Sequence, residues 1–399
     1  MSKPNANATP NLTHLKALAA AHAHLAAIVA DLRLQVLEQA TPIDLIACAW
    51  ISREHVALVG PQGEAKTMLA DRFSQYTTAA TFSRLLTRFS TPDEVLGHFS
   101  LAKLQQDLYE RRVQGMAPEA GLVVLDEIFK ANSPMLNSLL GMMNERRVDG
   151  LACKLDTLIG LSNEWPRGID SLAREGDDDS LLPLWDRFVY RYEVKRPQGD
   201  DTFMAVLCGV LPDAAEAPMT DAEVATLRAE VARVHAGLAA QPAMLAAFKD
   251  IRRELLAKGV QISSRRWNKA GRAVAAHAVL NGRCAVAHSD LRVLEHVLWN
   301  TPAERDAVRE VILASGNPDD AHALTVEAEV ASLINSATAL TGTDLMAKLP
   351  GMVKAINAHK ADLDALMAGA EDATELRRVA TWLNAQANAL SSRLLDALR

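Results

Sequence analysis

The sequence contains few cysteines, few aromatic residues and no excess of positive charge, and each shortage excludes a class of protein. Its 399 residues include four cysteines that lie far apart without zinc-site spacing, so neither a zinc site nor a disulfide-stapled fold is expected. The 42 basic and 49 acidic residues give a net charge of −7, which argues against a general nucleic-acid binder. Aromatic residues make up 5% and alanine is abundant, which favours helices over sheet along most of the chain.

Long apolar runs are also missing from the sequence. No stretch reaches the ~18 consecutive apolar residues that a membrane helix needs, and the polar N-terminus does not resemble a signal peptide. We therefore expect a cytoplasmic protein without a transmembrane segment. The length is too great for one compact core and predicts two or three domains.

The stretch from His55 to Thr67 has the pattern of a phosphate-binding loop. Apolar residues 55–59 predict a strand, and the motif G-x-x-x-x-G-K-[ST] follows, with Ala65 in place of its second glycine. In this motif backbone N–H groups cradle phosphates, the lysine reaches the β- and γ-phosphates, and the hydroxyl binds Mg²⁺. The candidate nucleotide-binding residues are Gly60, Pro61, Gln62, Gly63, Glu64, Ala65, Lys66 and Thr67.

A second motif lies about 60 residues further on. Residues 122–125 are apolar without alternation, which predicts a strand that is covered on both faces, as in a parallel sheet. Asp126 and Glu127 follow at its C-terminal end, where α/β sheets bind their ligands. In this position we expect Asp126 to hold Mg²⁺ together with Thr67, and Glu127 to orient and polarise an attacking water molecule.

Residues 155–161 predict another buried strand, which ends at Ser162-Asn163-Glu164. If the sheet is parallel, the amide of Asn163 lies beside the two carboxylates and can hold water or the γ-phosphate. The alternative is an asparagine that caps a helix or forms a turn. The acidic segment 174–180 is predicted to be a solvated loop, since its spacing does not fit an EF-hand calcium loop.

Three arginines stand at the ends of predicted elements. Arg187 precedes a strand over 189–194, with Asp186 as its tether; taken alone, it could be part of a surface ion pair, which contributes little. Arg265 and Arg266 open a helix after Ser263-Ser264, where a cation opposes the helix dipole. An incoming phosphate would resolve that conflict.

The order of patterns divides the chain into four parts. We predict a tail and helical extension over 1–34, an αβα nucleotide-binding domain over 35–198, an all-α lid over 199–290 and a helical domain over 291–399. The last helix carries apolar residues at mixed spacings of three and four, which favours a helical bundle or hairpin.

Taken together, these motifs resemble the AAA+ ATPases, more narrowly the MoxR family and within it the RavA (regulatory ATPase variant A) branch. The resemblance implies an α/β P-loop NTPase core with a parallel sheet flanked by helices, an all-α lid and a helical C-terminal region. The stretches that carry it are GPQGEAKT (60–67), TRFSTPDEVLG (87–97), YERRVQGMAPEAGLVVLDEIFKA (109–131), LNSLLGMMNER (136–146), SNEWP (162–166), LWDRF (184–188) and SSRRW (263–267).

The resemblance assigns roles residue by residue. Lys66 and Thr67 match Walker A, Asp126 and Glu127 match Walker B, Asn163 matches sensor 1, Arg187 matches the arginine finger, and Arg265, less directly Arg266, matches sensor 2. It implies ATP and Mg²⁺ as ligands, hexameric rings and a partner that contains a von Willebrand factor A domain. Loops 97–118 and 147–154 match the family's hairpin inserts, which face the ring pore or partners. Residues 300–399 lack the β-rich module that RavA members carry.

Our leading hypothesis is a Mg²⁺-dependent ATPase ring that remodels or activates a protein client, with no nucleic-acid partner. Two alternatives remain at this point. One is an ATP-gated assembly scaffold with slow hydrolysis, which the long helical termini motivate. The other is the motor subunit of a metal-chelatase-like complex, which no metal-ligand cluster in the sequence supports.

Overall fold

The computed structural model describes residues 12–166, 181–209, 211–315, 318–338, 342–367 and 374–397. The predicted tail over 1–11 and the predicted acidic loop over 174–180 lie outside this part. The chain forms two compact units, the first made of Met1–Phe248 and Leu255–Val308, the second of Lys249–Glu254 and Arg309–Arg399. The four-part division drawn from the sequence stays a prediction.

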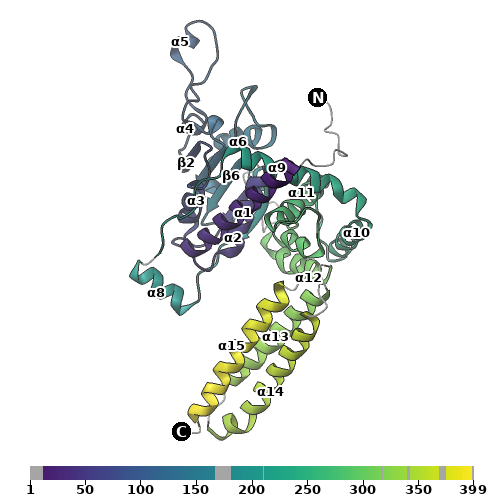
Figure 1. Ribbon diagram of the computed structural model, residues 1–399. Coiled ribbons are helices and arrows are strands. Elements are labelled where there is room, and N and C mark those ends of the chain that lie inside the picture. Colours follow the sequence, from purple (N-terminus) through teal and green to yellow (C-terminus); the bar gives the residue numbers. More distant parts are fainter. Residues whose placement is uncertain are drawn as a thin grey trace. The chain divides into compact units, whose positions relative to one another are not determined.

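Five parallel strands form the central sheet of the first unit (Figure 1). Their spatial order is β2 (Thr81–Leu85), β3 (Leu122–Asp126), β6 (Thr157–Ser162), β1 (His55–Val59) and β7 (Phe188–Glu193). The predicted α/β core with a parallel sheet is therefore confirmed. Because the strands run the same way, the C-terminal ends of β1, β3 and β6 meet at one edge of the sheet.

Helices cover the sheet and bury its central strands. Every residue of β1 and of β6 is buried, as expected for apolar strands covered on both faces. The helix α2 (Ala40–Ser52) packs on β1, β6 and β7, and α3 (Lys66–Ser74) packs on β3 and β6. Trp50 of α2 meets Phe73 of α3 edge to face, with 5.4 Å between ring centroids, which fixes the helix after the phosphate-binding loop.

The N-terminal extension is one long helix, α1 (Leu12–Gln35). By length and composition alone, this helix could cross a membrane. The sequence analysis considered only unbroken apolar runs, and polar residues interrupt this helix. In the structure, α1 packs against α2 and α9 (Asp221–Gly237) and buries one face. The side chain of Asp31 accepts a hydrogen bond from the hydroxyl of Tyr76, so α1 is also tied to the end of α3.

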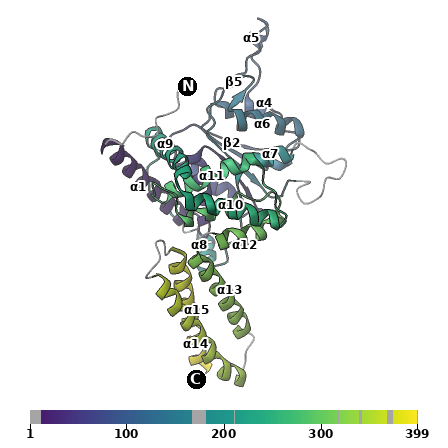
Figure 2. The same cartoon turned by 90° about the vertical axis from the view of Figure 1, so that its right-hand side faces the viewer.

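Two hairpin-like excursions leave the sheet, and they include the loops 97–118 and 147–154 that the sequence analysis matched to hairpin inserts. The first carries the short helices α4 (Asp93–Leu96) and α5 (Leu101–Leu104), and α5 projects away from the sheet in both views (Figures 1 and 2). The second is the pair β4 (Arg147–Val148) and β5 (Leu151–Ala152), which follows α6 (Ser133–Glu145). The 3-10 turns η1 (Ala117–Glu119) and η2 (Ile128–Lys130) flank β3.

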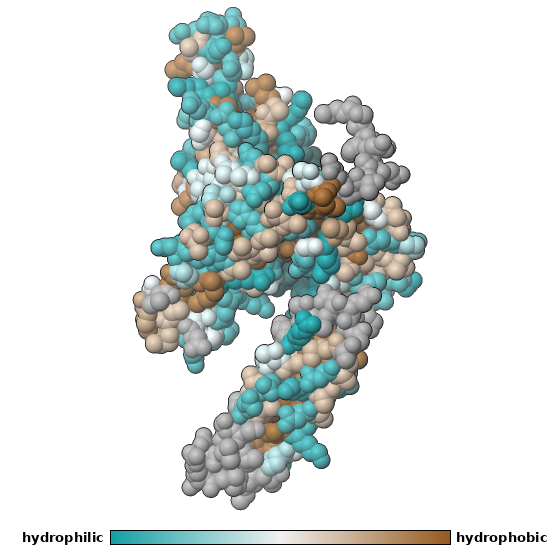
Figure 3. All heavy atoms as spheres, viewed as in Figure 1, coloured by the Kyte–Doolittle hydropathy of each residue, from teal (hydrophilic) through white to brown (hydrophobic). Residues whose placement is uncertain are grey.

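The rest of the first unit is helical. After α7 (Leu181–Arg187) and β7, α8 (Asp200–Cys208) exposes Phe203, Met204, Val206 and Leu207, and hydrophobic atoms gather over it in Figure 3. Thr220 starts α9 and forms a capping box with Glu223. The other elements are η3 (Leu238–Ala240), α10 (Pro242–Ala257), α11 (Ser264–Leu280), η4 (His288–His296), η5 (Pro302–Glu304) and α12 (Arg305–Ser315). Of these, Lys249–Glu254 of α10 and residues 309–315 of α12 belong to the second unit.

The second unit contains three long helices, α13 (Pro318–Thr338), α14 (Gly342–Met367) and α15 (Thr374–Ala397). The apolar seam predicted for the last helix is buried in their shared core. That core includes Leu376, Val379, Leu383, Ala387 and Leu390 of α15, together with Val330 of α13 and Ile356 of α14. The predicted bundle or hairpin is thus confirmed as a bundle within one chain.

Candidate functional site

The phosphate-binding loop joins β1 to α3 at the ligand edge of the sheet. The loop turns because two residues adopt left-handed backbone conformations, Gly63 with φ of 85° and Ala65 with φ of 54°. Ala65 is the N-cap of α3, so the backbone N–H groups of the first turn of this helix face the loop. The sequence departure at Ala65 therefore leaves the loop conformation intact, since alanine adopts the dihedral that glycine would adopt at lower energy.

Lys66 is buried at the start of α3, and its ammonium group donates to three oxygens. The acceptors are the carbonyls of Gly60 at 2.7 Å and Pro61 at 2.6 Å, and Oδ1 of Asn163 at 2.9 Å. Burial lowers the pKa of Lys66, an effect that three nearby carboxylates oppose. A partly desolvated ammonium held beside a loop of N–H donors is suited to bind a phosphate group.

Thr67 and Asp126 bring two oxygen ligands together. The hydroxyl of Thr67 donates to Oδ2 of Asp126 at 3.0 Å, while Oδ1 of Asp126 accepts from the backbone N–H of Glu127 at 2.8 Å. Hydroxyl and carboxylate oxygens suit Mg²⁺, which binds one or two carboxylates and completes its shell with water and phosphate oxygens. The described residues contain no group of three or more His, Cys, Asp or Glu side chains that could hold a metal. A Mg²⁺ site built from Thr67, Asp126 and phosphate oxygens does not need such a group.

Three donors from two residues converge on the carboxylate of Glu127, one of them the backbone N–H of Asn163, which lies 3.4 Å from Oε2. Nδ2 of Asn163 donates to Oε1 of Glu127, and the ammonium of Lys130 lies 3.0 Å from the same oxygen. Glu127 has φ of 55°, and this left-handed turn directs the chain from β3 into η2, which carries Lys130. The predicted neighbourhood of Asn163 and the two carboxylates is confirmed geometrically, whereas the sequence analysis missed Lys130, which the i, i+3 spacing from Glu127 could have indicated.

These side chains line a cleft of ≈ 620 Å³ beside the loop. Its walls also include residues that the sequence analysis did not select, namely Met68, Leu85, Leu86, Thr87 and Arg88. A second cleft of ≈ 490 Å³ shares Gly63, Glu64 and Ala65 with the first and continues toward α8. Its other walls include Val36, Leu37, Gln39, Phe203 and Val206. The second cleft is thus the more apolar of the two.

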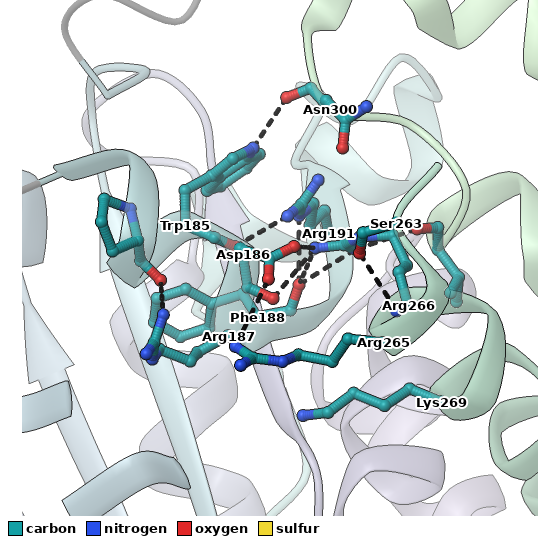
Figure 4. Close-up of polar contacts among 12 residues, drawn as sticks. Trp185, Asp186, Arg187, Phe188, Arg191, Ser263, Arg265, Arg266, Lys269 and Asn300 are labelled. Carbon is teal, nitrogen blue, oxygen red and sulfur yellow. Dashed lines mark hydrogen bonds and ion pairs between the residues drawn. The ribbon is translucent and has the colours of Figure 1, made fainter. Parts of the chain in front are cut away.

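Arg187 and Arg265 lie together, but not in the cleft of their own chain. Neither is among the residues that line it. In Figure 4, Arg265 extends from α11 toward Asp186, 3.8 Å away, and Arg187 turns from the end of α7 toward the carbonyl of Pro183. Burial lowers the pKa of Arg187, and the positive charge of Arg265 lowers it further. Nη1 of Arg187 donates to the carbonyl of Pro183 at 2.5 Å, which holds its side chain along α7.

Arg266 differs from its neighbour Arg265 in that its side chain is buried. It is 2% exposed, and its guanidinium donates to the carbonyl of Val297 at 2.9 Å and to the carbonyl and carboxylate of Asp186 at 3.0 and 3.2 Å. Burial opposes ionisation of Asp186, yet Arg266 and two other arginines lower the pKa of this carboxyl. The predicted tether from Asp186 to Arg187 is replaced by this pair, because α11 places Arg266 directly against the end of α7.

Two family models match the chain. Residues 23–232 match the model described as the MoxR domain in the MoxR-vWA-beta-propeller ternary systems. Residues 243–312 match the AAA lid domain. The first match contains all the cleft residues described above together with Arg187, and the second contains Arg265 and Arg266.

Similar proteins include two from Methanocaldococcus jannaschii. The uncharacterized protein MJ0812 is 31% identical over 317 residues, which cover 76% of this chain and 79% of that protein. The uncharacterized protein MJ0079 is 30% identical over 277 residues, which cover 68% of each chain. Among solved structures, a candidate ATPase from Cytophaga hutchinsonii has a TM-score of 0.58 at 15% identity and covers 76% of this chain and 98% of its own, which shows a shared fold.

Proposed function

We propose a function from the premise that this chain belongs to the MoxR family of AAA+ ATPases: it hydrolyses ATP and uses the reaction to remodel or activate a protein client. The observation that carries the proposal is the continuous network from Lys66 through Asn163 to Glu127 at the edge of the sheet. It joins a phosphate-binding cation to the carboxylate that would act on water.

The roles of the site residues follow from this network. Lys66 and the loop N–H groups would hold the β- and γ-phosphates, and Thr67 and Asp126 would hold Mg²⁺, which neutralises charge on the phosphate oxygens. Glu127 would orient the attacking water and accept its proton, with Asn163 fixing the carboxylate. The second cleft, with apolar walls and the amide groups of Gln35 and Gln39, would take the adenine base.

The positions of Arg187 and Arg265 support action on a neighbouring chain. Both stand outside their own cleft. The positive charge of Arg265 lowers the pKa of Arg187, so an additional anion near these two residues would be stabilised. In a ring, a head-to-tail interface can bring such a face to the cleft of the next chain. We therefore propose a homo-oligomer, most simply a hexamer, in which Arg187 is the arginine finger and Arg265 is sensor 2. Arg266 would support sensor 2 by anchoring α11.

The proposal also names a partner protein and a location in the cell. The matched family model is named for systems that combine MoxR, vWA and β-propeller proteins. We propose a protein with a von Willebrand factor A domain as the adaptor to the client, in the cytoplasm. Membership in the RavA branch stays a prediction. The scaffold alternative predicts assembly with ATP but without turnover; the chelatase-like alternative lacks a metal-ligand group among the described residues.

The test is phosphate release from Mg-ATP by two inactive variants, measured separately and after mixing. Glu127→Gln should bind ATP without hydrolysing it, and Arg187→Ala should lower turnover by about 10³-fold with ATP affinity unchanged. Mixing them should restore hydrolysis, because an Arg187→Ala cleft can meet the intact arginine of a Glu127→Gln neighbour.

The control mixture combines Glu127→Gln with Lys66→Ala, and we expect less recovery from it. There every arginine is intact and every cleft is inactive. A mixture of Glu127→Gln and Arg187→Ala that stays inactive would contradict action in trans. Normal turnover by Glu127→Gln alone would contradict the catalytic assignment, and ATP-driven assembly of wild-type chains without turnover would favour the scaffold.

A further inference from the structure

Three tryptophans from separate segments form a closed triangle in the first unit. Trp165 follows β6, Trp185 lies in α7 and Trp299 follows η4. The ring centroids are 5.9 Å apart for Trp165 and Trp185, 5.8 Å for Trp165 and Trp299, and 5.7 Å for Trp185 and Trp299. Each aromatic pair of this kind contributes about 0.5–1.5 kcal/mol beyond its burial. The triangle therefore links the three segments more firmly than apolar contact alone.

The triangle rests on a buried guanidinium. The charged carbon of Arg191 lies 4.3 Å from the ring centre of Trp185, and its nitrogens donate to the carbonyls of Trp185 and Phe188 at 2.7 and 3.1 Å and to that of Trp299. Nε1 of Trp185 donates to the carbonyl of Asn300 at 2.7 Å (Figure 4). Closely packed groups that are held by buried hydrogen bonds transmit a displacement instead of absorbing it.

The ends of this cluster carry residues of two different sites. Trp165 is two residues after Asn163, whose amide reaches Lys66 and Glu127 at the cleft of the same chain. Trp185 is two residues before Arg187, which lies outside that cleft. Between them, Asp186 is bound to Arg266 and so to the helix of Arg265. The indole contact of Trp165 with Trp185 is thus a short physical path from one site to the other.

We propose that Trp165 and Trp185 are positioning residues that couple the two sites. Contact between Asn163 and the γ-phosphate in one chain would set the orientation of the arginine that this chain presents to the next. This inference rests on the proposed function, specifically on the action of Arg187 in trans. In a ring, the nucleotide state of one cleft would then control hydrolysis in the cleft of the next chain.

A purely structural role makes a different prediction. Trp185 and Trp299 are 3% and 1% exposed and belong to the core, whereas Trp165 is only partly buried. If the triangle served packing alone, the change Trp165→Leu would lower the melting temperature and would affect hydrolysis only through the chain that carries it. If the triangle couples the sites, the change would slow the neighbour.

The experiment uses mixed rings in which the variant chain cannot hydrolyse ATP itself. Wild-type chains are mixed with a ninefold excess of a carrier chain, and phosphate release is measured per wild-type chain. The reference carrier is Glu127→Gln, and the test carrier is the double variant Trp165→Leu, Glu127→Gln. The control carrier is the double variant Trp382→Leu, Glu127→Gln, which makes the same kind of change in the second unit. The double variant Arg187→Ala, Glu127→Gln shows how far hydrolysis falls when the carrier has no arginine finger.

In random rings, roughly nine of ten wild-type clefts then face a carrier arginine. The Arg187→Ala carrier should lower hydrolysis per wild-type chain by about tenfold relative to the reference, and the Trp165→Leu carrier by about threefold or more. The Trp382→Leu carrier should equal the reference. The KM for ATP should stay unchanged with every carrier, since the wild-type cleft itself is intact.

Equal hydrolysis with the Trp165→Leu and reference carriers would overturn the coupling while leaving the proposed function in place. An Arg187→Ala carrier that equals the reference would overturn both, since no arginine would then act in trans. Should Trp165→Leu fail to enter rings on size analysis, a Trp165→Phe carrier decides in the same way: slower hydrolysis than the reference supports the coupling, and equal hydrolysis overturns it.

Discussion

The ammonium of Lys66 donates a hydrogen bond of 2.9 Å to the side-chain oxygen of Asn163, which lies 97 positions further along the chain. The same amide group donates to Glu127 through its nitrogen. One asparagine therefore connects the cation that would bind phosphate to the carboxylate that would act on water. A phosphate that attracted Lys66 would compete with this contact, so a single side chain would link binding to the catalytic carboxylate.

Replacing Lys66 by methionine should weaken ATP binding without destabilising the fold. The variant loses the charge that would meet the phosphates, and we expect ATP affinity to fall by about 10- to 100-fold, as for loss of a hydrogen bond to a charged group. The melting temperature without nucleotide should change little, because an apolar side chain tolerates burial better than an ammonium. Titration with a fluorescent ATP analogue and thermal unfolding check both. Lys103→Met, on the projecting excursion, is the control, and unchanged affinity for Lys66→Met would contradict the assignment.

Alanine substitutions of the two adjacent arginines of α11 should affect different properties, stability for Arg266 and turnover for Arg265. Arg266→Ala removes a buried guanidinium and leaves Asp186 partly unpaired, so it should destabilise the fold by about 3–5 kcal/mol and lower the melting temperature by roughly 10 °C. Arg265→Ala should change the free energy of unfolding by less than about 0.5 kcal/mol and yet lower turnover. Thermal unfolding and phosphate release measure the difference. Full turnover in Arg265→Ala would rule out its sensor role.

Gly60 tests how closely the backbone packs at the start of the loop. A Cβ there would lie 2.5 Å from the carbonyl oxygen of Val194, so Gly60→Ala should destabilise the fold by about 1–3 kcal/mol and weaken ATP binding. The matched control is Gly237→Ala at the end of α9, where a Cβ meets nothing within 4 Å and φ is −67°. It should stabilise the fold by about 0.5–1 kcal/mol. The prediction does not survive if both variants shift the chemical denaturation midpoint in the same direction.

The contact between α1 and α9 should depend on pH. A hydrogen bond from His24 to Glu223 raises the pKa of His24 above 6.5 and lowers that of Glu223 from 4.5 to about 2. The contribution of His24 is complete below pH 6.5 and is lost as pH rises through its raised folded-state pKa. That of Glu223 is complete above pH 4.5 and is lost as pH falls toward 2.

The two contributions overlap between pH 4.5 and 6.5. The variant His24→Ala should therefore be less stable than wild type by up to about 1 kcal/mol near pH 5.5, and by less at pH 9. Urea unfolding at the two pH values measures this. His14→Ala, on the exposed side of the same helix, is the control. A stability difference that grows toward pH 9 would show the wrong sign.

The sequence determines the centre of the site better than its periphery. Lys66, Thr67, Asp126 and Glu127 lie in local patterns next to apolar strands, and a parallel sheet brings those strand ends together whatever the rest of the chain does. The position of Asn163 followed from the same rule. These predictions needed one long-range assumption only, that the strands are neighbours and parallel.

Contacts that depend on helix docking could not be derived in that way. Arg265 and Arg266 are adjacent in sequence, and the rotation of α11 decides which one is buried. The ion pairs of Asp186, at 3.2 Å from Arg266 and 3.8 Å from Arg265, depend on the same rotation. The tryptophan triangle joins Trp165 and Trp185 to Trp299, more than 100 residues away, and no local periodicity indicates such a contact.

Ala65 holds a left-handed conformation that a glycine would adopt at lower energy, a difference of roughly 1–2 kcal/mol in the folded chain. The methyl group also removes backbone freedom that a glycine would keep before phosphate binds. This loop is therefore stiffer at rest than one that carries the second glycine, and it loses less entropy on closing around a ligand. The loop therefore needs little rearrangement to bind an anion.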